Sequence, residues 1–323
     1  MIELFELEKP FNSIINHFLF LKKELQKIII GQEEIIHKLL IGIITNGHIL
    51  IEGVPGLGKT LLIKTLAKFC NVDFKRIQFV PDLMPADIIG FHIFNPQKNE
   101  FTFKKGPIFT NFLLADEINR AQPRTQSALL ECMEERQVSS DKVTYKLSEP
   151  FIVFATQNPI EHEGVFPLSE AQIDRFLFKL VIKYPNFDSE FIILKKFLNE
   201  LDNNNFNGKN ILNGNDILTI QKLLNSIKIS NDILNYLLRI AKKTRNHPDI
   251  KLGMSTRSLI HIVKASQACA LLSHRTYVIP QDIKYIIFDI LRHRLILNPL
   301  SALDKSVEMI IEEILDETTP YNE

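Results

Sequence analysis

Residues 53–60 constrain this chain more than any other stretch, because they read Gly-Val-Pro-Gly-Leu-Gly-Lys-Thr and fit the phosphate-loop pattern G-x-x-x-x-G-K-(S/T). The glycines let the backbone curl, so that successive N–H groups and the start of the next helix face phosphate oxygens. Lys59 is expected to reach the β- and γ-phosphates, and the Thr60 hydroxyl to ligate Mg²⁺. The residues predicted to bind a nucleoside triphosphate here are Gly53, Val54, Pro55, Gly56, Leu57, Gly58, Lys59, Thr60 and Leu61.

The sequence around this loop supports the same interpretation. An apolar run at 48–51 predicts a buried strand before it, and 61–69 predicts a helix after it. An ordinary glycine-rich turn is the alternative, and it does not require both flanking elements.

The pattern of elements changes near residue 187. Up to residue 183, short apolar strands alternate with amphipathic helices, which is typical of an α/β domain with a mostly parallel sheet. After residue 186, apolar residues recur at three- and four-residue steps, which predicts helices throughout. We therefore expect an α/β nucleotide-binding core over 1–186 and a smaller helical domain over 187–323. The predicted strands span 48–52, 76–80, 112–116, 151–155 and 177–182, and the predicted C-terminal helices span 188–200, 216–226, 230–244, 256–272, 280–291 and 303–315.

Two carboxylates, Asp116 and Glu117, follow the apolar strand at 112–116. Catalytic groups of open α/β sheets gather at the carboxyl ends of strands, which is where this pair is expected. Asp116 could hold Mg²⁺ through its water shell, and Glu117 could polarise a water for attack on the γ-phosphate. The alternative is a strand that simply ends in a charged loop. The phosphate loop upstream favours the catalytic interpretation, and the second acidic residue favours a hydrolase over a small-molecule kinase.

The strand at 151–155 leads into Thr-Gln-Asn-Pro at 156–159. By itself this is only a strand that enters a turn. We expect the strand to lie beside the phosphate-loop strand, so that Asn158 can position the attacking water or contact the γ-phosphate.

Composition and charge indicate a cytoplasmic enzyme. Basic and acidic residues both number 38, and zero net charge counts against a dedicated non-specific nucleic-acid binder. The first six residues lack the features of a signal peptide, and no apolar stretch approaches the ~18 residues that span a bilayer. Cys70, Cys132 and Cys269 have no paired spacing, and we interpret them as reduced, buried residues.

Longer motifs extend from about residue 31 to residue 294. They include Leu-Ala-Asp-Glu-Ile-Asn-Arg-Ala at 114–121 and Ala-Thr-Gln-Asn-Pro-Ile at 155–160. The others lie at 31–32, 78–79, 81–83, 106–109, 125–131, 133–138, 167–176, 252–257 and 291–294. With the phosphate loop, these motifs resemble the MoxR family of AAA+ ATPases. The resemblance implies an AAA+ P-loop core followed by a small all-helical lid domain, with ATP and Mg²⁺ as cofactors.

The resemblance also implies catalytic roles for Asn158 and for two arginines. Asn158 takes the place of sensor 1, and Arg257 that of the sensor 2 arginine in the lid. Arg175 occupies the place of the arginine finger, which acts on nucleotide held by the neighbouring subunit. A guanidinium is a planar, always-charged fork, which suits the negative charge that spreads over the γ-phosphoryl oxygens.

Other assignments leave more than one interpretation open. Gly31 and Gln32 are implied to lie against the adenine. Arg120 could instead form an ordinary surface ion pair, and the same alternative exists for Arg175 and Arg257.

Two segments are expected to form hairpin insertions, near 91–105 and 136–149. In the family such insertions face the pore or the partner. The four phenylalanines of the first segment could form an exposed contact surface, or they could pack the hairpin onto the core. They are Phe91, Phe94, Phe101 and Phe103.

For function, the resemblance implies an ATPase that acts as a chaperone-like remodelling or maturation factor for protein partners, some of which carry a von Willebrand factor A domain. It also implies a homo-oligomeric ring, most commonly a hexamer. One alternative is a nucleic-acid motor or loader, against which zero net charge and the lack of a helix-turn-helix or winged domain count. The other is a regulatory module in which hydrolysis is only a timer.

Overall fold

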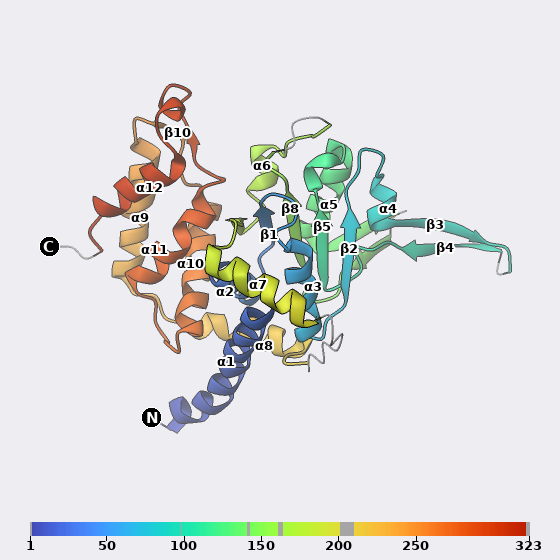
Figure 1. Ribbon diagram of the computed structural model, residues 1–323, viewed down its shortest axis with the longest axis horizontal. Helices are drawn as coiled ribbons and strands as arrows, with labels where there is room; N and C mark the ends of the chain where they lie inside the picture. The colour runs from blue at the N-terminus through green and yellow to red at the C-terminus, as the bar shows by residue number, and fades with distance from the viewer. Residues whose placement is uncertain (1, 98, 141–142, 161–163, 201–209, 321–323) are drawn as a thin grey trace.

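A computed structural model describes residues 2–97, 99–140, 143–160, 164–200 and 210–320 of the chain. Its centre is a sheet of five parallel strands in the order β2-β5-β8-β1-β9 (Figure 1). The strands are β1 (Ile49–Glu52), β2 (Phe74–Gln78), β5 (Phe112–Asp116), β8 (Ile152–Gln157) and β9 (Phe178–Val181). Each end lies within two residues of its predicted position, and the predicted α/β fold with a parallel sheet is confirmed.

Helices surround the sheet and make up most of the C-terminal part of the chain (Figure 1). The helices before residue 187 are α1 (Ile2–Ile28), α2 (Glu33–Ile44), α3 (Lys59–Phe69), α4 (Pro85–Ile89), α5 (Pro123–Glu135) and α6 (Glu170–Ile173). Those after it are α7 (Phe187–Glu200), α8 (Gly214–Leu223), α9 (Asn231–Asn246), α10 (Thr256–Leu272), α11 (Pro280–Leu291) and α12 (Val307–Asp316). Short 3-10 helices are η1 (Ile118–Arg120), η2 (Leu224–Ser226) and η3 (Ser301–Leu303). Among the described residues, none of the helices combines the length and the apolarity needed to cross a membrane.

One small sheet departs from the helical pattern expected after residue 186. Strands β10 (Ile250–Leu252) and β11 (Ile296–Leu297) pair antiparallel at one end of the C-terminal helices. Strands this short give no periodic signal in the sequence, which is why the pattern predicts only helices here.

Both faces of the three inner strands, β5, β8 and β1, are buried, because alternate residues of these strands enter different apolar clusters. In β5, Phe112 and Leu114 join the cluster that includes α1, α2 and α3, whereas Leu113 and Ala115 join the cluster on the α5 side. Each of these inner strands therefore reads as an apolar run with its polar residues at the carboxyl end. That edge of the sheet carries the predicted site.

Helices α9 to α12, with the segments between them, form the lid. The lid packs directly on the core: α10 contacts α2, and α11 contacts β9. Lys38 of α2 also forms a buried ion pair with Asp289 of α11. One apolar cluster runs through core and lid, so the proposed division at residue 186 separates two units that share packing. Helix α1, which the sequence pattern did not predict, contacts both units.

Two hairpins lie where insertions are expected, formed by β3 (Gly90–Asn95) with β4 (Glu100–Lys105) and by β6 (Gln137–Ser140) with β7 (Val143–Lys146). The first projects far from the body of the protein (Figure 1), whereas residues 141–142 at the tip of the second lie outside the described residues. The phenylalanines divide between the two expected arrangements. Phe103 stacks on Tyr145 of the second hairpin, with ring centroids 4.5 Å apart. Phe91, Phe94 and Phe101 are exposed.

The three cysteines are free and buried, in agreement with the interpretation of the sequence. Burial raises the pKa of each thiol, that of Cys132 to about 12. The thiols therefore stay protonated and act as small packing groups.

Candidate functional site

The predicted phosphate loop connects β1 to α3 and leaves room above its glycines. Gly56 and Gly58 have φ values of +86° and +74°, in the region that favours glycine. A Cβ atom at either position would meet nothing within 4 Å, so these backbone segments border open space. The Lys59 ammonium lies 2.5 Å from the Gly53 carbonyl oxygen, folded back over the loop. The loop therefore leaves room beside its backbone for an anion of phosphate size.

A cavity of about 630 Å³ lies beside this loop. One side of it consists of Pro55, Gly56, Leu57, Gly58 and Leu61. The rest is largely apolar and comes from the end of α1, residues 184–185 and α7. The volume and the mixture of apolar wall and polar loop suit a nucleotide, with the base in the apolar part. Gln32 lines the same cavity, and its side-chain amide donates a hydrogen bond of 2.9 Å to the Lys183 carbonyl oxygen. Gly31 adjoins it, with φ of +75°.

Asp116, at the end of β5, lies beside Thr60 of the phosphate loop. Its Oδ2 atom is 3.4 Å from the Thr60 hydroxyl, and its Oδ1 atom accepts a hydrogen bond of 2.5 Å from Thr156. A hydroxyl and a carboxylate are hard oxygen donors, the type that Mg²⁺ prefers, so this pair fits the expected ion. Arg76 of β2 contacts the same Oδ2 atom from Nε and Nη2, at 3.0 and 2.7 Å.

Glu117 follows Asp116 in a left-handed conformation, with φ of +58°. This turn separates the two carboxylates, although they are adjacent in sequence. The Glu117 Oε2 atom accepts a hydrogen bond of 2.7 Å from Gln78 and pairs with Arg120 Nε at 3.0 Å. Its backbone N–H donates to the Thr156 hydroxyl at 2.9 Å. The carboxylate is thus held at the rim of the site by groups from β2 and from η1, and Arg120 forms the ion pair that was the alternative for it.

Asn158 follows β8, which pairs with both β5 and β1. The expectation that this strand lies beside the phosphate-loop strand is confirmed. The Asn158 side chain is buried, and its Oδ1 atom accepts a hydrogen bond of 3.2 Å from the Ile160 N–H. Asn158 therefore sits at the same sheet edge as Asp116, between the carboxylate strand and the phosphate loop.

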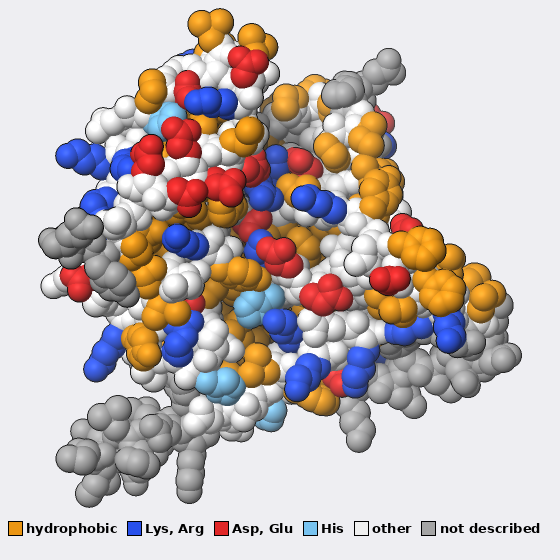
Figure 2. Space-filling view, turned by 60° about the vertical axis from the view of Figure 1, so that its left-hand side comes forward, with side chains coloured by type: hydrophobic (Ala, Val, Ile, Leu, Met, Phe, Trp, Pro, Cys, Tyr) orange, Lys and Arg blue, Asp and Glu red, His pale blue; other side chains and the backbone are white. Residues whose placement is uncertain are grey.

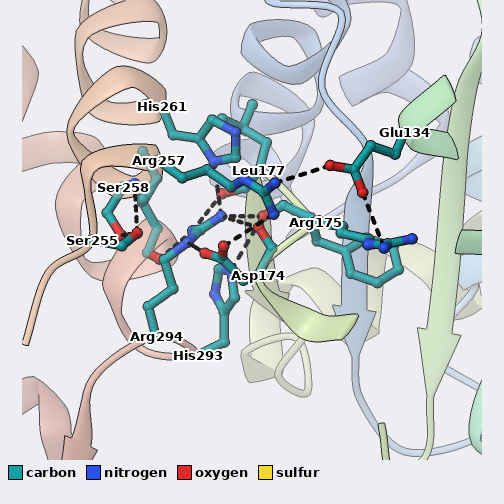
Figure 3. A network of polar contacts seen from close by, with 12 residues as sticks. Glu134, Asp174, Arg175, Leu177, Ser255, Arg257, Ser258, His261, His293 and Arg294 are labelled. Atoms are coloured by element: carbon teal, nitrogen blue, oxygen red, sulfur yellow. Dashed lines mark hydrogen bonds and ion pairs between the residues drawn. The ribbon is translucent and has the colours of Figure 1, made fainter. Parts of the chain in front are cut away.

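The two remaining predicted arginines meet on a different surface (Figure 3). Glu134 of α5 pairs with Arg175 through Oε2 and with Arg257 through Oε1, each at 3.0 Å. Arg257 also contacts Asp174 at 3.2 Å. Neither arginine lines the cavity beside the phosphate loop; both line a smaller cavity with His48, Glu134 and His261. The structure thus places the predicted site residues in two groups: the phosphate loop with its neighbouring cavity and strand ends, and a separate arginine surface, which carries Arg175 and Arg257.

A buried histidine holds the Glu134 end of α5 against the sheet. His48 precedes β1; its Nε2–H donates to the Met133 carbonyl oxygen and its Nδ1 accepts from the Val153 N–H, both at 3.0 Å. Burial and the nearby charge of Arg136 lower the pKa of His48 to about 3. The ring is therefore neutral near pH 7, in keeping with one nitrogen that donates and one that accepts.

Sequence reasoning missed Arg76 and Gln78 as site residues. Both lie on β2, two positions apart, so they share one face of the sheet and lie next to β5, where Gln78 is in register with Asp116. Their two-residue spacing, on a strand expected in the same sheet as the Asp116 strand, was the available signal.

The chain is similar to known proteins along most of its length. Residues 48–178 match the family model of the ATPase family associated with various cellular activities (AAA), and residues 242–314 match the AAA lid domain. The uncharacterized protein YeaC of Bacillus subtilis is 44% identical over 91% of each chain. Chaperone MoxR1 of Mycobacterium tuberculosis is 42% identical over 90% of this chain and 79% of its own. The crystal structure of a "putative ATPase" from Cytophaga hutchinsonii is 43% identical and superposes over the whole of both chains with a TM-score of 0.91.

Proposed function

Because the chain belongs to the MoxR family of AAA+ ATPases, we propose that it hydrolyses ATP and couples hydrolysis to the remodelling or activation of a protein partner. The observation that carries the chemistry is the meeting of the phosphate loop, Asp116 and Glu117 at one edge of the sheet. A second carboxylate, held apart from the ion-binding one, favours activation of a water over transfer to a bound substrate.

Each residue of this edge has a proposed role. Thr60 and Asp116 would hold Mg²⁺, and the ion would neutralise phosphate charge. The amides of the loop and Lys59 bind the phosphates. Glu117 polarises the attacking water, and Asn158, on the adjacent strand, orients it.

The arginine surface supports a role between subunits. Arg175 and Arg257 share Glu134 and lie outside the cavity of their own phosphate loop, so the nucleotide on which they act belongs to a neighbouring subunit. When one surface of a subunit binds a different surface of the next copy, the subunits form a ring if the rotation between successive subunits closes. A hexamer is the ring that the family resemblance implies.

A protein partner is favoured over nucleic acid by the charge of the surface. The net charge is zero, and on the face in Figure 2 basic and acidic side chains are interspersed rather than gathered into a basic stripe. The exposed phenylalanines of the β3–β4 hairpin offer apolar contact area. The relative named as a chaperone agrees with this role. The proposal also includes a partner that carries a von Willebrand factor A domain. It further includes a cytoplasmic location for this protein.

The test combines an activity measurement with capture of the partner. Glu117→Gln is expected to trap ATP-bound protein, and pull-down from its native cells should enrich a protein that Lys59→Ala does not retain. The captured protein, once purified, should stimulate ATP hydrolysis by the wild type, whereas double-stranded or single-stranded DNA should not. Stimulation by DNA alone would replace the proposal with the nucleic-acid motor.

A further inference from the structure

Arg294, which follows α11 in the lid, inserts its guanidinium into the core (Figure 3). The side chain is only 3% exposed. It pairs with Asp174 Oδ1 at 2.7 Å and donates to the carbonyl oxygens of Asp174, Phe176 and Leu177 at 3.0, 2.5 and 3.2 Å. A buried charge is tolerated only when it is paired and hydrogen-bonded, and this one is bonded on several sides.

Residues 174–177 form the short connection between α6 and β9, and Arg294 bonds to three of these four residues. Arg175 lies inside this segment, and the groups bonded to Arg294 lie on both sides of it in sequence. The core secures the same segment through its N–H groups: Leu177 donates to the His48 carbonyl oxygen at 2.7 Å. The backbone that carries Arg175 is therefore held from the core on one side and from the lid on the other.

Two further lid residues complete this contact. His261 Nδ1 accepts a hydrogen bond of 2.8 Å from Arg294, and burial together with the charges of Arg294 and Arg257 lowers the pKa of His261 to about 3, so the ring is neutral. Arg257 of the same helix bonds Asp174 and Glu134, and Glu134 in turn holds the Arg175 guanidinium. The lid thus reaches Arg175 both through its backbone and through its ion-pair partner.

We propose that Arg294 is a positioning residue for Arg175. The placement of the lid on the core then determines the position in which Arg175 faces the nucleotide of the neighbouring subunit. The proposal rests on the proposed role of Arg175 between subunits. A guanidinium is needed because a planar fork can bond the Asp174 carboxylate and the backbone carbonyls together, whereas a lysine ammonium is a compact point charge. Arg294 itself does not touch the nucleotide cavity of its own subunit.

Subunit mixing tests this assignment. When one subunit has a defective Arg175 segment and its neighbour has a defective phosphate loop, a mixed ring still contains some interfaces at which both parts are intact. Arg294→Lys should bind ATP with unchanged affinity and lower turnover by a factor of about 10 or more. When it is mixed with an equal amount of Lys59→Ala subunits, about a quarter of the ring interfaces combine an intact phosphate loop with an intact Arg175 segment, and activity should reappear. Mixing with Arg175→Ala should restore nothing, because both subunits lack a correctly presented arginine.

Arg275→Lys is the matched control. Arg275 is a lid arginine bonded to Asp282 and to the Tyr277 carbonyl oxygen, both within the lid, so its change tests a general loss of lid stability. It should keep wild-type turnover. Asp174→Asn provides a second variant, should Arg294→Lys fold poorly, and it should show the same mixing pattern.

The outcomes separate this inference from the proposed function. If Arg175→Ala is restored by Lys59→Ala but neither Arg294→Lys nor Asp174→Asn is, Arg294 serves only its own subunit and the inference is overturned while the role of Arg175 stands. If Arg175→Ala itself is not restored, the role between subunits is wrong and the inference falls with it.

Discussion

The side-chain amide of Gln78 donates a hydrogen bond of 2.7 Å to the Oε2 atom of Glu117, across two neighbouring strands. Gln78 in turn accepts a hydrogen bond of 2.6 Å from Arg76, whose guanidinium also binds Asp116. The proposed water-activating carboxylate and the proposed ion-binding carboxylate are therefore linked through two side chains of β2.

Gln78→Ala should raise basal turnover by about fivefold, because a hydrogen bond worth about 1 kcal/mol no longer has to break before Glu117 turns toward the water. Steady-state ATP hydrolysis measures this change. Lys75→Ala, an exposed change on the same strand, is the control. A fall in turnover would show instead that Gln78 holds Glu117 in its working position.

Lys59→Ala and Glu117→Gln should separate binding from chemistry. The first removes the cation that faces the phosphates and should abolish ATP binding. The second keeps the phosphate loop intact and should bind ATP normally while turnover falls by a factor on the order of 10². Fluorescent-nucleotide titration and phosphate release measure the two quantities, and equal loss of binding in both variants would make Glu117 a structural residue.

Arg175→Ala should leave ATP binding intact and suppress turnover, because the charge it provides acts on the neighbouring nucleotide. Sedimentation of the wild type should show an assembly that ATP favours, and zero net charge offers little long-range repulsion against it. Mixing with Lys59→Ala subunits should restore part of the activity. A wild-type protein that remains a monomer at every concentration while it hydrolyses ATP normally is incompatible with this prediction.

Stability should decrease as the pH falls below about 6.5, in part because of His48. Its pKa is about 3 in the folded protein and about 6.5 in an unfolded chain, so the unfolded chain binds more protons between these values. The stability that depends on neutral His48 is therefore complete above pH 6.5 and is lost progressively toward pH 3. Between pH 7.5 and 5.5 this loss amounts to about 1.4 kcal/mol.

Urea unfolding at pH 7.5 and 5.5 checks this pH dependence. His48→Gln, which can still donate and accept a hydrogen bond, should lose less stability over the interval than the wild type. His17→Gln, an exposed change on α1, should behave like the wild type. Equal pH dependence in all three proteins would remove His48 as a cause.

The elements at the edge of the sheet beside the phosphate loop could largely be predicted from sequence, whereas the arrangement of their side chains could not. The strand before the loop, the positive-φ glycines and the position of Asp116 follow from local patterns of apolar and small residues. The separate placement of the Asp116 and Glu117 carboxylates could not be predicted in the same way, because it depends on the left-handed turn at Glu117 and on partners from β2.

The sequence by itself determined the parallel sheet, the phosphate loop and the helices that follow, because hydrophobic periodicity and a short motif fix the backbone locally. Only the tertiary structure decided that Arg294 binds a segment about 120 residues earlier, and that Arg175 and Arg257 share Glu134. These contacts depend on how α10 and α11 pack against α2 and β9, and apolar packing of that kind is non-directional. The spacing of residues along the chain therefore does not indicate which charged residues the packing brings together.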